Sequence, residues 1–171
     1  MISFYKQSGE FMKTLKILIL SLATVFAFSS FAFSETVTFT GTGYITTNIE
    51  VSATSDGRNL QNYTNSGFWI QEGLPEGFPG TVVADCQGVA LATAEWANLG
   101  DAFICVATDG DGDGFINVGG STQPDYSDCH AETVAAWGKY SDVTQSVKCK
   151  FVGRVTPDAI MLTWTGEFTT P

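Results

Sequence analysis

The sequence has little positive charge. Eight Lys and Arg residues stand against 18 Asp and Glu residues, and the formal net charge at pH 7 is −10. Five of these basic residues follow Ser34, namely Arg58, Lys139, Lys148, Lys150 and Arg154. A protein with such a surface repels the phosphates of nucleic acids and anionic membranes, and it attracts cations. The composition therefore predicts that nucleic acid is not a partner.

The sequence also lacks most of the residue patterns that mark an active site. His130 is the single histidine, and neither a Cys-x-x-Cys pair nor a Gly-x-Ser-x-Gly motif occurs. Zinc sites and serine triads depend on such residues, so neither is expected. His130 follows Cys129, but a cysteine held in a disulfide is not a nucleophile. Carboxylate pairs for glycoside hydrolysis are numerous, yet no pair is marked, so we assign no catalytic residue and favour a protein that is not an enzyme.

Long helical periods are missing after the first 34 residues, and short alternating segments take their place. Glu35–Gly41 and Ala159–Phe168 place apolar residues at every second position, which is the pattern of a half-buried strand. Turn residues recur about every ten positions, as they do in sandwiches and barrels. Gly41 and Gly43 are expected to make a bulge or bend between a first and a second strand. The pattern predicts one all-β domain, either a sandwich or a barrel.

The start of the chain predicts export. Met12–Ser34 has the three parts of a signal peptide: a short basic segment, the apolar run Ile17–Phe28, and small residues before a cleavage site. We therefore expect a leader over 1–34, a single domain over 35–171, and a secreted or periplasmic product. The apolar run is shorter than the roughly 20 residues of a membrane span, so no membrane insertion is expected after cleavage.

All four cysteines follow this leader. An even number of cysteines in an exported chain predicts two disulfides among Cys86, Cys105, Cys129 and Cys149. Four cysteines allow three connectivities. Each consecutive pair flanks a stretch that looks like a connection between strands, which favours pairing 86 with 105 and 129 with 149.

The strongest chemical signature is Thr108–Gly120, which reads TDGDGDGFINVGG. Asp109, Asp111, Asp113 and the backbone carbonyl of Phe115 fit the first half of an EF-hand-type calcium loop. The twelfth position of such a loop is normally a bidentate glutamate, and here it is glycine. The alternative is a hairpin turn in which glycines supply positive φ and aspartates accept bonds from backbone amides. Calcium is the one cofactor suggested, with a dissociation constant of about 10⁻⁴–10⁻³ M.

Aromatic residues make up 13% of the chain, which is enough to line a ligand cavity or to fill a β core. The candidates for a lining are Phe68, Trp69, Trp96, Phe103, Trp137, Tyr140 and Trp164. A lining of this kind predicts a small apolar ligand as the partner.

Four short segments resemble a known group of proteins. They are Asp85-Cys86-Gln87-Gly88, Cys105-Val106-Ala107-Thr108-Asp109, Trp137-Gly138-Lys139-Tyr140 and Trp164-Thr165-Gly166. Together they are similar to bacterial secreted proteins of the allene-oxide-cyclase-like barrel group, over Thr81–Phe168. The resemblance implies an antiparallel barrel of about eight strands, of the calycin or allene-oxide-cyclase type, and leaves the sandwich as second choice. Plant cyclases of this group act on an oxidised fatty acid and the related dirigent proteins guide radical coupling, but no catalytic residue of theirs matches a position here.

Three hypotheses about function follow. The first is an exported, disulfide-stabilised barrel that binds a small apolar ligand in its interior. The second is a cyclase- or isomerase-like enzyme that uses the same cavity, and the third is a calcium-stabilised surface or adhesion module. A packed interior would favour the third hypothesis, and an open interior without convergent polar groups would favour the first. A buried carboxylate or tyrosine hydroxyl facing an open cavity would favour the second.

Overall fold

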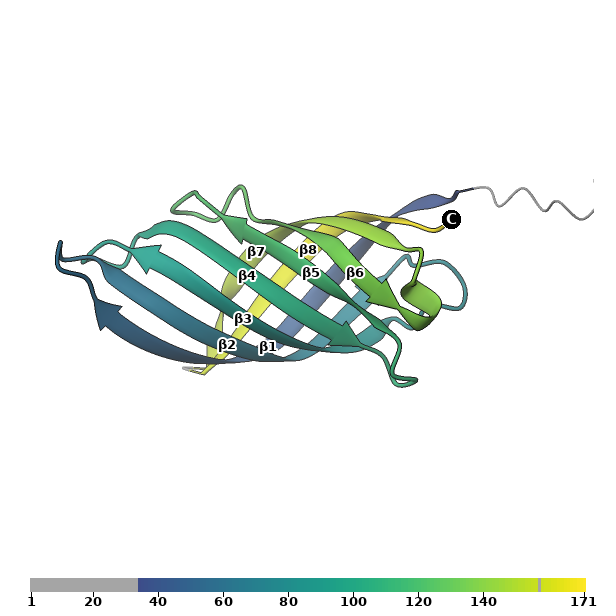
Figure 1. Cartoon of the computed structure of the whole chain (residues 1–171), viewed down its shortest axis with the longest axis horizontal. Coiled ribbons are helices and arrows are strands. Elements are labelled where there is room, and N and C mark those ends of the chain that lie inside the picture. Colours follow the sequence, from purple (N-terminus) through teal and green to yellow (C-terminus); the bar gives the residue numbers. More distant parts are fainter. Residues whose placement is uncertain (1–33, 157) are drawn as a thin grey trace, which may run out of the picture. The chain divides into compact units, whose positions relative to one another are not determined.

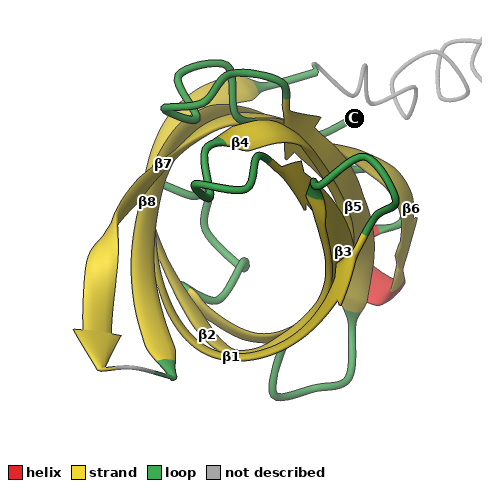
Figure 2. Ribbon diagram, turned by 90° about the vertical axis from the view of Figure 1, so that its left-hand side faces the viewer, coloured by secondary structure: helices red, strands yellow, loops and turns green. Residues whose placement is uncertain are grey.

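A computed structural model describes residues 34–156 and 158–171, so the predicted signal peptide, apart from Ser34, lies outside the described residues. These residues form a closed antiparallel barrel in which eight strands follow one another in chain order and β1 pairs with both β2 and β8 (Figures 1 and 2). The all-β barrel is confirmed, and the second choice, a sandwich, is not formed. Closure leaves each strand with a neighbour on both sides, which suits a small domain.

The strands are long for a domain of this size. They are β1 (Thr36–Ala53), β2 (Asn59–Glu72), β3 (Thr81–Ala92), β4 (Asn98–Thr108), β5 (Gly114–Ser121), β6 (His130–Trp137), β7 (Thr144–Thr156) and β8 (Ala159–Thr169), with a short 3-10 helix, η1 (Gly138–Tyr140), before β7. Nowhere in the described part of the chain is there a helix that is both long and apolar enough to cross a membrane.

Alternation along each strand decides which side chains enter the barrel. In β1, Phe39 and Ile45 point inward and are buried, while Thr40 and Tyr44 between them are exposed. This is the period of two that a strand imposes on its side chains. The apolar alternation read from the sequence therefore marks the inner face of the barrel.

One half of the barrel is packed solid. This half, called here the closed end, contains the start of β1, the end of β8, the β2–β3 and β4–β5 loops and η1. Phe39, Phe168, Phe115 and Tyr140 are at most 1% exposed, and Phe78 of the β2–β3 loop lies between Phe168 and Tyr140 with ring centroids 4.8 and 5.3 Å away. Interlocking rings of this kind exclude water and supply much of the hydrophobic stabilisation of a small β domain.

The other half, called here the open end, is built differently. Large rings lie across glycines that are their direct partners on the neighbouring strand, and a Cβ atom on any of these glycines would collide with the ring. The pairs are Trp164 with Gly41, Tyr63 with Gly88, and Phe103 with Gly119. Gly41 and Gly43 do not make the expected bulge: β1 runs through them as one strand, and their missing side chains accommodate the ring of Trp164. Rings placed along the wall leave the middle of the barrel unfilled.

Both predicted disulfides form, with Cys86 bonded to Cys105 and Cys129 to Cys149. The first joins directly opposite residues of β3 and β4, which already pair over ten positions. The second holds the weakest seam of the barrel, because β6 and β7 pair at three positions only. Cys129 comes just before β6 and Cys149 lies within β7, so this disulfide extends the seam toward the open end.

Candidate functional site

The open end contains a cavity of about 390 Å³ inside the barrel. Its walls are mostly apolar and include Ile45, Trp69, Phe103, Leu162 and Trp164. An eight-stranded barrel is just wide enough for its side chains to fill it or to hold one small molecule. Here the rings that lie over glycines leave space for a molecule, and the volume falls in the range of about 300–1,000 Å³ that is usual for ligand pockets.

Polar atoms in the wall of this cavity lack partners within the protein. Among the described residues, five cavity-lining side chains each have one buried polar atom without a hydrogen bond: Thr47 Oγ1, Asn65 Oδ1, Trp69 Nε1, Gln71 Oε1 and Gln145 Nε2. Buried polar groups are nearly always bonded, because leaving one unpaired costs about 1–3 kcal/mol. Five residues of the cavity lining therefore have hydrogen-bonding capacity that the protein itself does not use.

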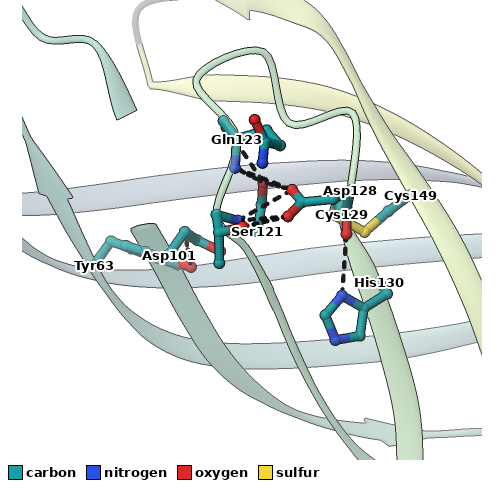
Figure 3. Close-up of a disulfide and its surroundings, with 9 residues drawn as sticks. Tyr63, Asp101, Ser121, Gln123, Asp128, Cys129, His130 and Cys149 are labelled. Carbon is teal, nitrogen blue, oxygen red and sulfur yellow. Dashed lines mark hydrogen bonds between the residues drawn. A yellow bond between two sulfur atoms is a disulfide. The ribbon is translucent and has the colours of Figure 1, made fainter. Parts of the chain in front are cut away.

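A carboxyl group faces the cavity near its mouth. Asp101 lies on the inner face of β4, and its Oδ2 accepts a hydrogen bond of 2.7 Å from the hydroxyl of Tyr63, whose ring reaches across β3 over Gly88 (Figure 3). Burial raises the pKa of Asp101, and the bond from Tyr63 only partly offsets this effect. Burial and the negative charge of Asp101 together raise the pKa of Tyr63. The pair thus combines a carboxyl whose raised pKa disfavours ionisation with a phenol whose raised pKa keeps it protonated.

Tyr126 completes this polar corner from the loop between β5 and β6. It lines the cavity with φ at 58°, a left-handed conformation that a bulky residue adopts only when its surroundings enforce it. Burial, followed by the charge of Asp101, raises the pKa of Tyr126. Its backbone is fixed by bonds from the Tyr126 amide to the Gln123 carbonyl and from the Cys129 amide to the Tyr126 carbonyl, both 3.1 Å.

Asp128 organises the same loop. Its carboxylate accepts bonds from the hydroxyls of Ser121 and Thr122 and from the amides of Thr122 and Gln123, as Figure 3 shows in part. The bonds from Ser121 and Thr122 hold the pKa of Asp128 well below its usual range. Together with the Cys129–Cys149 disulfide, this network gives the cavity mouth a rigid rim.

The predicted aromatic lining is divided between three places. Trp69, Phe103 and Trp164 lie in the cavity wall. Phe68 does not, because it neighbours Trp69 on β2 and so points outward, where it is 58% exposed. Trp137 and Tyr140 do not reach the cavity either, since they lie at the closed end, where the indole nitrogen of Trp137 donates to the Gly112 carbonyl.

Trp96, the last of the aromatic candidates, is also outside the cavity lining. It lies in the turn between β3 and β4 with φ at 69° and is 57% exposed. Like Tyr126, it is an aromatic residue in left-handed backbone at the open end.

The acidic loop forms the hairpin between β4 and β5 at the closed end. Asp109 Oδ1 accepts bonds from the amides of Asp111 and Asp113, as expected of a tight turn. The ammonium group of Lys139, from η1, lies 2.9 Å from Asp109 Oδ2 and 2.8 Å from Asp111 Oδ2. It is also 3.8 Å from Asp113 Oδ2. The three predicted calcium ligands therefore surround a cation that the chain itself supplies.

The charged groups at this loop shift the pKa values of their neighbours. Burial alone would raise the pKa of Asp109, but the bonds from Lys139 and from the amides of Asp111 and Asp113 lower it. Burial and the nearby charge of Asp109 raise the pKa of Tyr140 to about 12. Phe115 is the fourth predicted ligand, and its side chain is fully buried in the closed-end core. Across 34–156 and 158–171 no three His, Cys, Asp or Glu side chains group into a metal site, and calcium binding stays a prediction.

Sequence reasoning missed Asp101, Tyr63 and Tyr126. A signal for Asp101 was present, because it is in phase with Cys105 on the same strand, and a cysteine in a disulfide marks the inner face. Tyr63 has no local signal, since its role depends on the register that places Gly88 opposite it. Tyr126 sits in a polar loop whose fold comes from Asp128 and the disulfide, which the local sequence does not reveal.

Neither a protein-family model nor a curated protein matches the sequence.

Proposed function

We propose that the protein is an exported, disulfide-stabilised barrel that binds one small, largely apolar molecule in its interior. The observation that carries the proposal is the cavity of about 390 Å³, whose apolar wall holds buried polar atoms without protein partners. A wall of this composition matches a molecule with an apolar body and a few hydrogen-bonding groups. Water can also bond to such atoms, so a guest gains affinity where its own polar groups replace the bonds of the water that it displaces.

Export is supported by two independent features. The segment Met12–Ser34 has the pattern of a signal peptide. Two disulfides are typical of proteins that fold in an oxidising compartment. The resemblance to secreted barrels of the allene-oxide-cyclase-like group agrees with this assignment and remains part of the proposal.

The proposal is tested by filling the cavity. Ala131 is a small, buried residue of β6 in the cavity wall, so Ala131→Leu should occupy part of the space. We expect wild-type protein to enhance the fluorescence of phenylnaphthylamine, an uncharged apolar probe, and to transfer energy to it from Trp69 and Trp164. Ala131→Leu should weaken binding of the probe by about tenfold or more, because steric overlap removes contacts throughout the cavity.

The matched control is Ala135→Leu, the same substitution at an exposed position of the same strand. It should leave probe binding unchanged. A melting curve shows whether each variant is folded, and Ala90→Leu on β3 fills the cavity from a second side if Ala131→Leu does not fold. Absence of fluorescence enhancement with the wild type, or equal binding by the filled and control variants, would overturn the proposal.

The cyclase- or isomerase-like function is a second candidate, and one observation favours it. Asp101 is a carboxyl with a raised pKa that faces the cavity beside the hydroxyl of Tyr63. A carboxyl with a raised pKa and a neighbouring phenol are suited to general acid–base catalysis, in which they transfer a proton to or from a bound molecule. Chemical change of a bound compound that Asp101→Asn abolishes would establish this function. The third hypothesis, a calcium-stabilised surface or adhesion module, would be favoured by a packed interior, and only the closed end is packed in this way.

A further inference from the structure

We propose that the ligand carries a basic nitrogen, and that Asp101 and the rings around it hold this cation at the cavity mouth. The inference rests on the proposed function and names the chemical class of the ligand. Two charged residues, Asp101 and Lys150, line the cavity among the residues described. Asp101 is half-buried in the wall, whereas Lys150 is exposed at the rim.

The carboxylate has spare capacity for a cation. In the described part of the chain its side chain makes one hydrogen bond, from Tyr63 to Oδ2. An ionised carboxylate accepts up to about four bonds, so Oδ1 and the remaining lone pair of Oδ2 have no bond from the described part of the protein. A protonated amine would donate to these sites and supply the positive charge that a buried carboxylate needs.

Aromatic rings surround the same position. Tyr63, Phe103 and Tyr126 all line the cavity, and they come from β2, β4 and the β5–β6 loop respectively. A cation next to aromatic faces gains about 0.5–2 kcal/mol, most where water is excluded. Tyr63 cannot turn its ring away without losing its bond to Asp101, since the ring lies over Gly88. The site therefore combines one carboxylate with rings fixed around it.

The loop that carries Tyr126 is built in advance of binding. Left-handed backbone at a bulky residue costs roughly 1–3 kcal/mol, and the bonds to Asp128 together with the Cys129–Cys149 disulfide maintain it. Strain retained at a cavity mouth indicates a residue positioned for a ligand. The net charge of −10 draws cations toward the mouth at the same time.

Three naphthalene compounds that differ only in one polar group test the inference: naphthylmethylamine, naphthylmethanol and naphthoic acid. Isothermal titration calorimetry at neutral pH should show the amine binding about tenfold or more tightly than the alcohol, with the acid weakest. Asp101→Asn keeps the size of the side chain and an acceptor for Tyr63. It should remove the preference for the amine and leave the affinity for the alcohol nearly unchanged.

Asp85→Asn is the control, because it changes the net charge equally at an exposed position on the outside of β3. It should retain the preference for the amine. Tyr126→Leu should weaken amine binding more than alcohol binding. Equal affinity for amine and alcohol, tightest binding of the acid, or equal effects of Asp101→Asn and Asp85→Asn would overturn the inference. If phenylnaphthylamine binds and the amine is not preferred, the inference alone fails; if no compound binds, the proposed function fails with it.

Discussion

The two ends of the barrel are built from the same eight strands, yet they are filled in opposite ways. At the closed end, Phe39, Phe78 and Phe168 point their rings into the middle and pack edge to face. At the open end, Trp164, Tyr63 and Phe103 lie over glycines along the wall. Both ends are rich in aromatic residues, so composition does not separate them. The residue opposite each ring distinguishes the two ends. Where that residue is glycine, the ring lies along the barrel wall and the middle of the barrel stays unfilled.

The two ends also differ in whether their carboxylates are paired with a cation of the protein. At the closed end, the ammonium group of Lys139 forms ion pairs with the carboxylates of Asp109 and Asp111. At the open end, Asp101 has a phenol as its partner and no cation among the described residues. A charge satisfied internally stabilises the fold, whereas a charge without a counter-ion favours a ligand that brings one. The paired charges therefore stabilise the closed end, and the proposed function places the ligand at the open end.

The largest effect is expected from truncation of the closed-end core. Phe168→Ala should lower the free energy of unfolding by about 3–5 kcal/mol, because it leaves a void among fully buried rings. Phe103→Ala should lower it by about half of that or less, since its ring already borders the cavity. Urea unfolding of both variants measures the difference, and equal losses would contradict the division between the two ends.

Removing each disulfide in turn should lower stability by similar amounts but affect binding of the probe differently. Their sequence separations are 19 and 20, so loss of either should cost a similar amount, about 3 kcal/mol. Substituting both Cys129 and Cys149 by Ala should also weaken binding of phenylnaphthylamine, because it frees the loop that carries Tyr126. The matching double substitution of Cys86 and Cys105 leaves a ladder of ten register pairs in place. Its affinity for the probe, measured by fluorescence titration, should change less.

The smallest effect is expected at the acidic loop. Lys139→Gln should lower the melting temperature at neutral pH, because Asp109 remains buried without its cation. A carboxyl whose pKa is lowered on folding contributes stability above its unfolded pKa of about 3.9, and this stability is lost as the pH falls through the folded value. The difference between Lys139→Gln and wild type should therefore shrink in acid.

Lys148→Gln makes the same charge change on the outside of β7 and serves as the control. Its melting temperature should stay near that of the wild type at every pH. Millimolar calcium added to Lys139→Gln tests the calcium prediction as well. A rise in melting temperature that Asp111→Ala abolishes would show that the loop accepts calcium once its own ammonium is removed, and no rise would count against calcium at this loop.

The sequence alone determined the all-β class, because alternation with a period of two records which face of each strand is buried. It also favoured, among three possible connectivities, the cysteine pairing that forms, since each consecutive pair flanks one strand connection. Residues whose contacts are to near neighbours were readable in the same way: the hairpin of Asp109, Asp111 and Asp113 is closed by bonds within the loop itself.

Only the tertiary structure decided where the cavity lies and what faces it. Phe68 and Trp69 are adjacent in sequence, and the barrel places one outside and the other in the cavity wall. Tyr63 reaches Asp101 across an intervening strand because register brings Gly88 opposite its ring. Lys139 meets Asp111 across 28 residues of chain. Such contacts depend on strand order and register, which follow from closure of the whole barrel and not from any one segment.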